Sequence, residues 1–319
     1  MQISEIKRVA CLGGGIIGSS WAIQFAMHGM DVVIRDINDE QLQKSADQMD
    51  KSLDTLVEAK AITAQRKSEI LAAIRLTTSV EDAVKDVQLV QENGPERLEI
   101  KQSILAEAER YLAPDAIYAS STSGLSITDI AAKAAHPERC VGAHPYNPPH
   151  LIPLVELTRG EKTAQETVDL VYAFYQSVGK EAVLLKKECP GFISNRLQLA
   201  LYREMVDLVQ RGVCSVKDAD KALVYGPGLR WAFLGHFMLM EIGNANGFLG
   251  MMKMLQANGN AMLPGMANWT TMPEDWSAFD EGVKEEMASL PDWMGHTDAQ
   301  CTAYRDRALI EALKLHRKL

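Results

Sequence analysis

The sequence predicts an α/β domain with a doubly wound, mostly parallel sheet, followed by an all-α domain. From Arg8 to about Lys187, short apolar runs rich in β-branched residues alternate with segments of helical spacing. Beyond Lys187 the strand-like runs stop and helical spacing continues. We therefore expect domains at residues 1–187 and 188–319.

The first half reads as a regular succession of strands and helices. Because parallel neighbours need a crossover connection, this alternation favours a parallel sheet. The expected strands are Arg8–Leu12, Val32–Arg35, Val87–Val90, Ile117–Ser120, Cys140–Ala143, Leu154–Leu157 and Ala182–Leu185. The expected helices are Ile16–His28, Glu40 to about Lys60, Thr63–Ile74, Glu96–Tyr111, Ser126–Lys133 (with Ser126 as N-cap) and Glu166–Val178.

The second half is expected to be helical apart from a loop-rich stretch at residues 259–293. One long helix is expected at Pro190–Gly212, with proline in its first turn and glycine at its end. Another is expected at Ser215–Tyr225, where Ser215 and Asp218 have capping-box spacing. Ten of the 15 methionines lie between Met238 and Met294, which favours adaptable core or subunit-interface packing.

Composition excludes several classes of protein. The formal net charge of −9 argues against a surface for nucleic acid or for anionic membranes. The five cysteines are scattered without a CxxC pair, so neither a metal site nor a disulfide framework is expected. The first residues lack the pattern of a signal peptide, and the longest apolar stretch is about half of the ~20 residues that a membrane span needs. We expect a cytoplasmic protein.

A glycine-rich segment points to a dinucleotide. Residues 13–18 read GGGIIG, which fits GxGxxG between the first strand and the first helix. Gly13 allows the tight turn, Gly15 the approach of a pyrophosphate to the backbone, and Gly18 close helix–strand packing. Amide groups at the helix N-terminus, including those of Ile16 and Ile17, face the phosphates. The alternative is a glycine-rich turn that binds nothing.

An acidic residue supports the prediction of a dinucleotide site and indicates which dinucleotide binds there. Asp36 ends the second expected strand, 23 residues after Gly13, where a carboxylate accepts the ribose hydroxyls. A carboxylate there repels a 2′-phosphate, so NAD is expected rather than NADP. Strand, turn, helix, strand and acid in this order predict a Rossmann-type domain.

Polar loops at the ends of three strands suggest catalysis. They are Ser120–Gly124, Gly142–Pro148 and Cys189–Arg196. Such loops converge on the ligand crevice of a parallel sheet. A histidine beside a buried carboxylate, here His144 with Glu156, makes a good general base, and serine or asparagine can orient an oxygen. Each also has an ordinary interpretation, as a core histidine, an ion-pair partner, a turn residue or a helix surface residue.

These motifs together resemble the 3-hydroxyacyl-CoA dehydrogenase family, and within it the branch of lambda-crystallin, L-gulonate 3-dehydrogenase and carnitine dehydrogenase. The resemblance extends from Gly13 to the terminal helix. It rests on residues 13–18, 121–124, 144–148, 154–156, 190–196 and 228–235.

The resemblance implies roles for individual residues. It makes His144 the catalytic base and Glu156 its partner, and it places Ser123 and Asn195 on the substrate oxygen. It also places Glu96 and Lys101 at the nicotinamide end of the cofactor. The implied reaction is NAD-dependent oxidation of a secondary alcohol at C3, with His144 acting as the acid in the reverse direction. The family further implies a homodimer formed through the helical domain.

The sequence departs from the acyl-CoA enzymes at Gly226–Gly235, where Arg230 lies among apolar residues. A buried arginine needs an anion, and its planar fork suits a free carboxylate. We therefore expect a small free 3-hydroxycarboxylate resembling L-gulonate, although a structural salt bridge is the alternative for Arg230. Carnitine is the second candidate, since Trp231 could face a quaternary ammonium if it does not pack in the core. A 3-hydroxyacyl-CoA is the third, and a non-catalytic crystallin-like or NAD-binding protein is the alternative of another class.

Overall fold

The computed structural model describes residues 1–318, which form two compact units. One comprises residues 1–196 and the C-terminal segment from residue 309, and the other comprises residues 197–308. The predicted fold class is confirmed, because the first unit is α/β and the second is helical. The first unit extends beyond residue 187 because α8 (Ser194–Gln210) begins within it and the end of α14 (Asp298–Leu315) returns to it.

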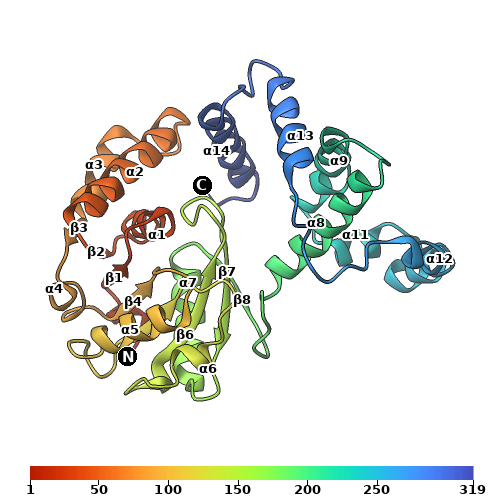
Figure 1. Ribbon diagram of the computed structural model, residues 1–319. Coiled ribbons are helices and arrows are strands. Elements are labelled where there is room, and N and C mark those ends of the chain that lie inside the picture. Colours follow the sequence, from red (N-terminus) through yellow and green to blue (C-terminus); the bar gives the residue numbers. More distant parts are fainter. Residues whose placement is uncertain (319) are drawn as a thin grey trace. The chain divides into compact units, whose positions relative to one another are not determined.

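The described part of the first unit contains an eight-stranded sheet in the order β3-β2-β1-β4-β5-β6-β7-β8 (Figure 1). Neighbouring strands are parallel except for β6 and β7, which are antiparallel. The strands are β1 (Arg8–Leu12), β2 (Asp31–Arg35), β3 (Ile74–Thr77), β4 (Leu89–Glu92), β5 (Ile117–Ser120), β6 (Cys140–Pro145), β7 (Leu154–Arg159) and β8 (Glu181–Leu184).

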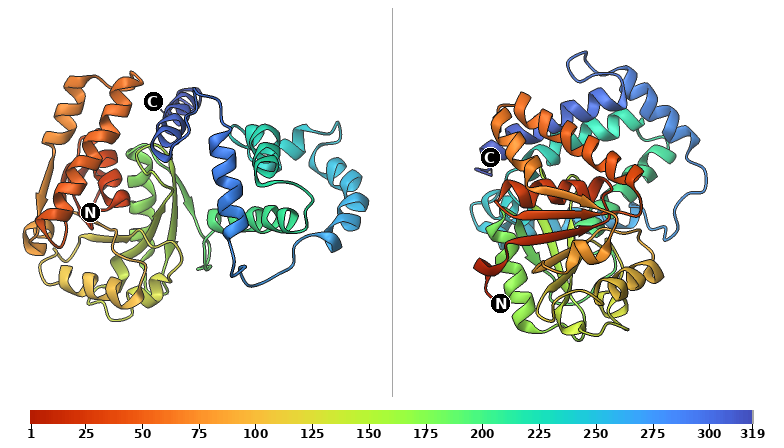
Figure 2. Two further views of the ribbon diagram at one scale, coloured as in Figure 1. Left: turned by 45° about the horizontal axis from the view of Figure 1, so that its top comes forward. Right: turned by 90° about the vertical axis from the view of Figure 1, so that its left-hand side faces the viewer.

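Helices cover both faces of this sheet (Figures 1 and 2). Alternation along β1 creates the two faces: Val9 and Cys11 belong to one buried cluster, and Ala10 and Leu12 to the other. The first cluster includes side chains of α1, α2, α3 and α7, and the second those of α4, α5 and α6. These helices are α1 (Ile16–Met27), α2 (Asp39–Glu58), α3 (Ala64–Ala72), α4 (Val80–Val84), α5 (Leu98–Ala108), α6 (Ile127–Ile130) and α7 (Gln165–Ser177).

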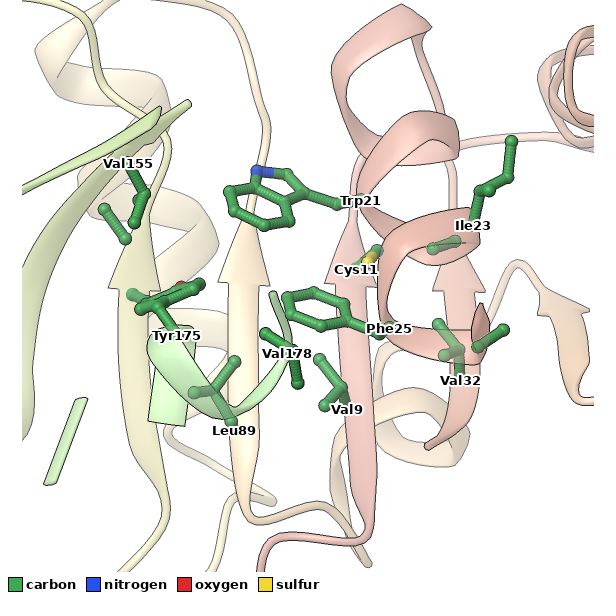
Figure 3. Close-up of a cluster of buried hydrophobic side chains, with 14 of the residues drawn as sticks. Val9, Cys11, Trp21, Ile23, Phe25, Val32, Leu89, Val155, Tyr175 and Val178 are labelled. Atoms are coloured by element: carbon green, nitrogen blue, oxygen red, sulfur yellow. The ribbon is translucent and has the colours of Figure 1, made fainter. Parts of the chain in front are cut away.

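Aromatic side chains fill the first cluster between α1 and the sheet (Figure 3). Trp21 stacks on Phe25 with ring centroids 5.1 Å apart, and Tyr175 of α7 lies 5.4 Å from Trp21. The three side chains are almost inaccessible to solvent. This packing fixes α1, and with it the glycine loop at its start, against the strands.

In the first unit one predicted helix end was wrong, and two elements, β3 and α4, were missed. Ile74 does not end a helix but begins β3, where it pairs with Val32 of β2. The short helix α4 was not expected at all. The edge strand β3 is only partly buried, so its sequence lacks the apolar run by which buried strands are predicted. The expected N-cap is confirmed, because the Ser126 side chain accepts a hydrogen bond from the Asp129 amide.

The second unit consists of helices and their connections. Besides parts of α8 and α14 it contains α9 (Val216–Leu223), α10 (Leu229–Trp231), α11 (His236–Ile242), α12 (Gly247–Met262) and α13 (Ser277–Ala288). The Ser215 side chain caps α9 as predicted, with the Asp218 amide 3.1 Å from its hydroxyl oxygen. The stretch expected to be rich in loops, residues 259–293, also contains the end of α12 and the whole of α13, which were not predicted there.

The long helix α8 begins at Ser194, so its predicted start at Pro190 was also wrong. Gly191 and Phe192 have φ of 75° and 50°, which is the left-handed region and interrupts any helix. Within residues 1–318, no helix combines the length and apolar character that crossing a membrane requires.

Candidate active site

The glycine loop joins the carboxyl end of β1 to α1. Gly13 has φ of 100°, and its amide donates to the Arg35 carbonyl at 2.8 Å. A Cβ on Gly18 would lie 1.8 Å from the Gly13 carbonyl oxygen. The conformation of the chain and its own packing therefore require glycine at both positions.

Gly15 is different, because nothing in the protein requires it. A Cβ there would meet no protein atom within 4 Å, and its φ of −63° suits any residue. Gly15 is the N-cap of α1, with Ile16 62% exposed beside it. The open space at a helix N-terminus is what a pyrophosphate needs, so the residues present fit a dinucleotide.

Asp36 stands beside this loop at the end of β2. Its two carboxylate oxygens accept hydrogen bonds from the amides of Gly14 and Ile37, each at 2.7 Å. Each carboxylate oxygen keeps a further lone pair that can accept a ribose hydroxyl. The carboxylate is thus oriented by the backbone before any ligand binds.

His144 and Glu156 face each other across the antiparallel pair β6 and β7. His144 Nδ1 lies 3.0 Å from Glu156 Oε2, and the imidazole is 8% exposed. The rings of Tyr146 and Phe192 flank it, with centroids 6.4 and 5.4 Å away. No hydrogen bond of the described residues involves Nε2, so this atom can exchange a proton with a ligand.

The backbone at the start of α8 surrounds Glu156. Its Oε1 accepts hydrogen bonds from the amides of Ile193 and Ser194, both at 2.9 Å, and Oε2 accepts one from the Ser194 hydroxyl. Burial by itself would raise the pKa of Glu156, but the hydrogen bonds from His144, Ser194 and Ile193 lower it below the ordinary value. Glu156 is therefore a carboxylate at neutral pH.

Ser123 and Asn195 also come together. The Asn195 side-chain amide donates to the Ser123 carbonyl at 3.3 Å. Among residues 1–318 the Ser123 hydroxyl has no hydrogen-bond partner, and its side chain is half-buried. Ser123 and Asn195 therefore place a hydroxyl and a side-chain amide close together, and both groups can donate hydrogen bonds to a ligand.

Glu96 shapes the loop that carries Ser123. Its Oε1 accepts from the amides of Ser123 and Gly124 at 2.9 and 3.0 Å and from the Thr122 hydroxyl at 2.7 Å. Partial burial would raise the pKa of Glu96, but these donors and the Lys101 charge lower it. The Glu96 carboxylate thus holds Ser123 in place.

Lys101 lies beneath this loop rather than on the surface. Its side chain is 1% exposed, and its ammonium lies 2.9 Å from Glu92 Oε1 and 3.1 Å from the Gly94 carbonyl oxygen. Glu96 Oε2 is 3.5 Å away. The structure therefore places Lys101 behind Glu96, enclosed by protein.

No role was predicted for Ser121, which follows β5 and whose hydroxyl links β4 and the residue after it to α1. Its hydroxyl accepts from Trp21 Nε1 at 3.2 Å and Gln91 Nε2 at 2.8 Å, and donates to Asn93 Oδ1 at 2.7 Å. The Asn93 carbonyl also borders the glycine loop, only 2.8 Å from where a Cβ on Gly13 would lie. No sequence pattern signals such contacts, because their partners are up to 100 residues apart.

Comparison with known families agrees with this arrangement. Residues 8–189 match the model of the 3-hydroxyacyl-CoA dehydrogenase NAD-binding domain, and residues 191–275 match the model of the C-terminal domain of the same family. The chain belongs to the 3-hydroxyacyl-CoA dehydrogenase family. The predicted cofactor, NAD, is confirmed, and this dehydrogenase is an oxidoreductase that acts on a hydroxyl group.

Two curated relatives resemble this dehydrogenase over nearly its whole length. The L-carnitine dehydrogenase of Streptomyces coelicolor is 37% identical, with 97% of this chain and 95% of the relative covered. The L-carnitine dehydrogenase of Pseudomonas aeruginosa is also 37% identical, with 98% and 94% covered.

Solved structures share the fold. A 5-formyl-3-hydroxy-2-methylpyridine 4-carboxylic acid 5-dehydrogenase, described as an NAD⁺-dependent dismutase, superimposes with a TM-score of 0.80 at 29% identity and covers 98% of both chains. The (S)-3-hydroxybutyryl-CoA dehydrogenase of Ralstonia eutropha gives 0.66 at 30% identity, with 82% of this chain and 91% of the other covered.

Arg230 of this dehydrogenase, in the second unit, departs from expectation. Its side chain is exposed, so the prediction of a buried arginine was wrong. No ion pair within residues 1–318 involves it, so the alternative of a structural salt bridge is not found either. Trp231 is likewise not in the core: it is 40% exposed, and its Nε1 donates to His236 Nδ1 at 3.3 Å. A short helix, α10, presents both side chains to solvent.

Proposed function

We propose that this enzyme oxidises the C3 hydroxyl of a small free 3-hydroxycarboxylate to the 3-keto acid. The observation that carries the proposal is the pairing of His144 with an ionised Glu156, with Nε2 of the imidazole left for the substrate. Ser123 and Asn195, which meet in the same unit, supply the groups that hold the reacting oxygen.

Each of these side chains has one task in the reaction. Bound NAD supplies the hydride acceptor for C3. His144 Nε2 takes the hydroxyl proton, and Glu156 stabilises the imidazolium that forms. The Ser123 hydroxyl and the Asn195 amide donate to the oxygen as it becomes a carbonyl. In the reverse direction the imidazolium returns the proton.

The dinucleotide site provides the other half of the proposal. The loop formed by Gly13, Gly15 and Gly18 would hold the pyrophosphate with the amides of Ile16 and Ile17, and Asp36 would accept the ribose hydroxyls. Glu96, with Lys101 behind it, would lie at the nicotinamide end of the bound cofactor. The support is the open space at Gly15 and the oriented Asp36 carboxylate.

For the substrate, the relatives named L-carnitine dehydrogenase favour carnitine as the first candidate, ahead of a sugar acid resembling L-gulonate. Both are free 3-hydroxy acids. In either case we propose that Arg230, exposed and without an internal partner, binds the substrate carboxylate. For carnitine, the exposed face of Trp231 suits the quaternary ammonium.

A screen of NAD reduction tests this function. L-carnitine, L-gulonate, 3-hydroxybutyrate and an L-3-hydroxyacyl-CoA are compared by the absorbance of NADH at matched concentrations. We expect a free hydroxy acid to give the highest kcat/KM. Turnover of the thioester alone would refute the free-acid proposal, and NADH formation with none of the hydroxy compounds would refute the function.

A further inference from the structure

A buried lysine lies close to the site without belonging to it. Lys180, between α7 and β8, is 2% exposed. In the described residues its ammonium faces no carboxylate, and burial followed by repulsion from Lys318 lowers its pKa to about 7. A charge held in this way destabilises the fold unless its contacts do something that an apolar side chain cannot.

The Lys180 ammonium interacts with two backbone carbonyls and one aromatic ring. Lys180 Nζ donates to the carbonyl of Pro149 at 2.8 Å and to that of Ile152 at 2.6 Å. It also lies 5.0 Å from the centroid of the Trp21 ring, within the range of a cation–π contact. Two backbone carbonyls of one segment thus share a single buried donor, which attaches that segment to Lys180.

That segment, residues 146–153, connects β6 to β7. His144 is the last residue but one of β6, and Glu156 lies opposite it on β7. The connection therefore joins the two strands next to the catalytic pair. The connection also receives a hydrogen bond at Pro153 O from the amide of Glu181, next to Lys180, at 2.8 Å.

The other side of the connection is attached to α1. The Ser20 hydroxyl lies 2.7 Å from His150 Nδ1 and 2.9 Å from the His150 amide. Trp21, the neighbour of Ser20 on α1, is the ring that Lys180 faces (Figure 3 shows this ring projecting from α1). Lys180 thus joins the connection, the dinucleotide-binding helix and the α7–β8 turn.

We propose that Lys180 is a positioning residue: by holding residues 149–152 against α1, it sets the alignment of His144 with Glu156. The proposal rests on the proposed function of that pair. It requires no contact between Lys180 and the substrate.

The test compares Lys180→Met with Lys67→Met. Lys67, on α3, also binds two oxygens, Asp50 Oδ1 at 2.7 Å and Asp54 Oδ1 at 2.6 Å, and both of these partners belong to α2. Hydrogen exchange of the peptide spanning residues 146–153, the Kd for NADH, kcat and KM are measured on the full chain. We expect Lys180→Met to speed exchange in this peptide and to lower kcat by about 10- to 100-fold, with the Kd for NADH within about threefold. Lys67→Met should change none of these.

A double mutant separates positioning from general destabilisation. In a Glu156→Gln background His144 no longer has the carboxylate with which Lys180 is proposed to align it. Adding Lys180→Met should therefore lower kcat little further. Independent effects, in which the two losses multiply, would overturn the proposal. If Lys180→Met does not fold, Lys180→Gln, which keeps two N–H donors, replaces it in both the wild-type and the Glu156→Gln background. Multiplying losses in that pair would overturn the proposal in the same way.

Two results on the single variant would also overturn the proposal. Unchanged exchange in residues 146–153 would mean that Lys180 does not hold the connection, and unchanged kcat with faster exchange would mean that the hold has no catalytic effect. Failure of the proposed function gives a different result. In that case the wild type oxidises no hydroxy acid in the screen, while the exchange measurement still reports whether Lys180 holds the segment.

Discussion

Glu156 serves two parts of the molecule at once. One oxygen accepts both amides at the start of α8, and the other is shared by His144 and the Ser194 hydroxyl. The side chain that orients the histidine also begins the helix that carries Asn195. Its loss should therefore affect both activity and stability.

We predict that Glu156→Gln lowers kcat by about 10²-fold or more and the free energy of unfolding at pH 7 by roughly 1–3 kcal/mol. Because the pKa of Glu156 is depressed in the folded state, its stabilisation is complete above the ordinary value of 4.5 and is lost as the pH falls through the lower folded value. Urea unfolding at pH 7, 5 and 3.5 should show the difference from wild type shrinking only below about pH 4.5. A difference as large at pH 3.5 as at pH 7 would contradict this, and Glu161→Gln, at an exposed position, is the control.

Arg230 offers a second test at this scale. Since it has no internal partner in the part of the chain that the structure describes, Arg230→Ala should leave the melting temperature within about 1 °C of wild type. If it binds the substrate carboxylate, KM for the hydroxy acid should rise by about 10-fold or more, since a charge-assisted hydrogen bond contributes roughly 1.5–3 kcal/mol. An unchanged KM would end this proposal.

The side chains expected to react could be predicted from local motifs, whereas the groups that hold them could not. Ser123, His144, Glu156 and Asn195 stand in short recognisable segments. Ser121 and Lys180 act through partners on other elements, and their types have no diagnostic spacing. The burial expected for Arg230 failed because apolar neighbours in sequence do not enclose a side chain on the three-residue helix α10.

At the scale of elements, the structural role of one glycine at the start of α1 can be distinguished from the ligand-binding role of another. Gly18→Ala would place a Cβ 1.8 Å from the Gly13 carbonyl oxygen, whereas Gly15→Ala would meet no protein atom. We predict that Gly15→Ala keeps the melting temperature of the ligand-free protein but weakens NADH binding by about 10-fold or more, and that Gly18→Ala lowers both. Calorimetry of unfolding and of NADH binding checks this. Normal NADH affinity in Gly15→Ala would mean that the dinucleotide does not approach this residue.

The elements whose bounds were predicted best are those whose bounds are determined by their own residues. β1 and β5 were predicted with their observed bounds, because each is a short apolar run next to a turn. The start of α8 was not, because Glu156, far away in sequence, accepts its first amides while Gly191 and Phe192 turn the chain. β3 was missed because an edge strand needs little apolar sequence.

At the scale of the whole molecule, we propose that the active form is a homodimer. In the helical unit, large apolar side chains are exposed, among them Leu229 at 59%, Phe237 at 76% and Leu249 at 73%. Exposed apolar side chains gathered in one part of a chain indicate an interaction surface. Light scattering should give about twice the 35.2 kDa of one chain, and a mass near that of one chain would contradict the dimer.

The central claim is that His144, held by Glu156, exchanges the substrate proton in an NAD-dependent oxidation. The most direct test is the His144→Gln variant, assayed with NAD and the best substrate of the screen and titrated with NADH. We predict a Kd for NADH within about threefold of wild type and a kcat lower by about 10²- to 10⁴-fold. A kcat within about threefold of wild type, less than 1 kcal/mol of barrier, would show that the reaction does not use this histidine.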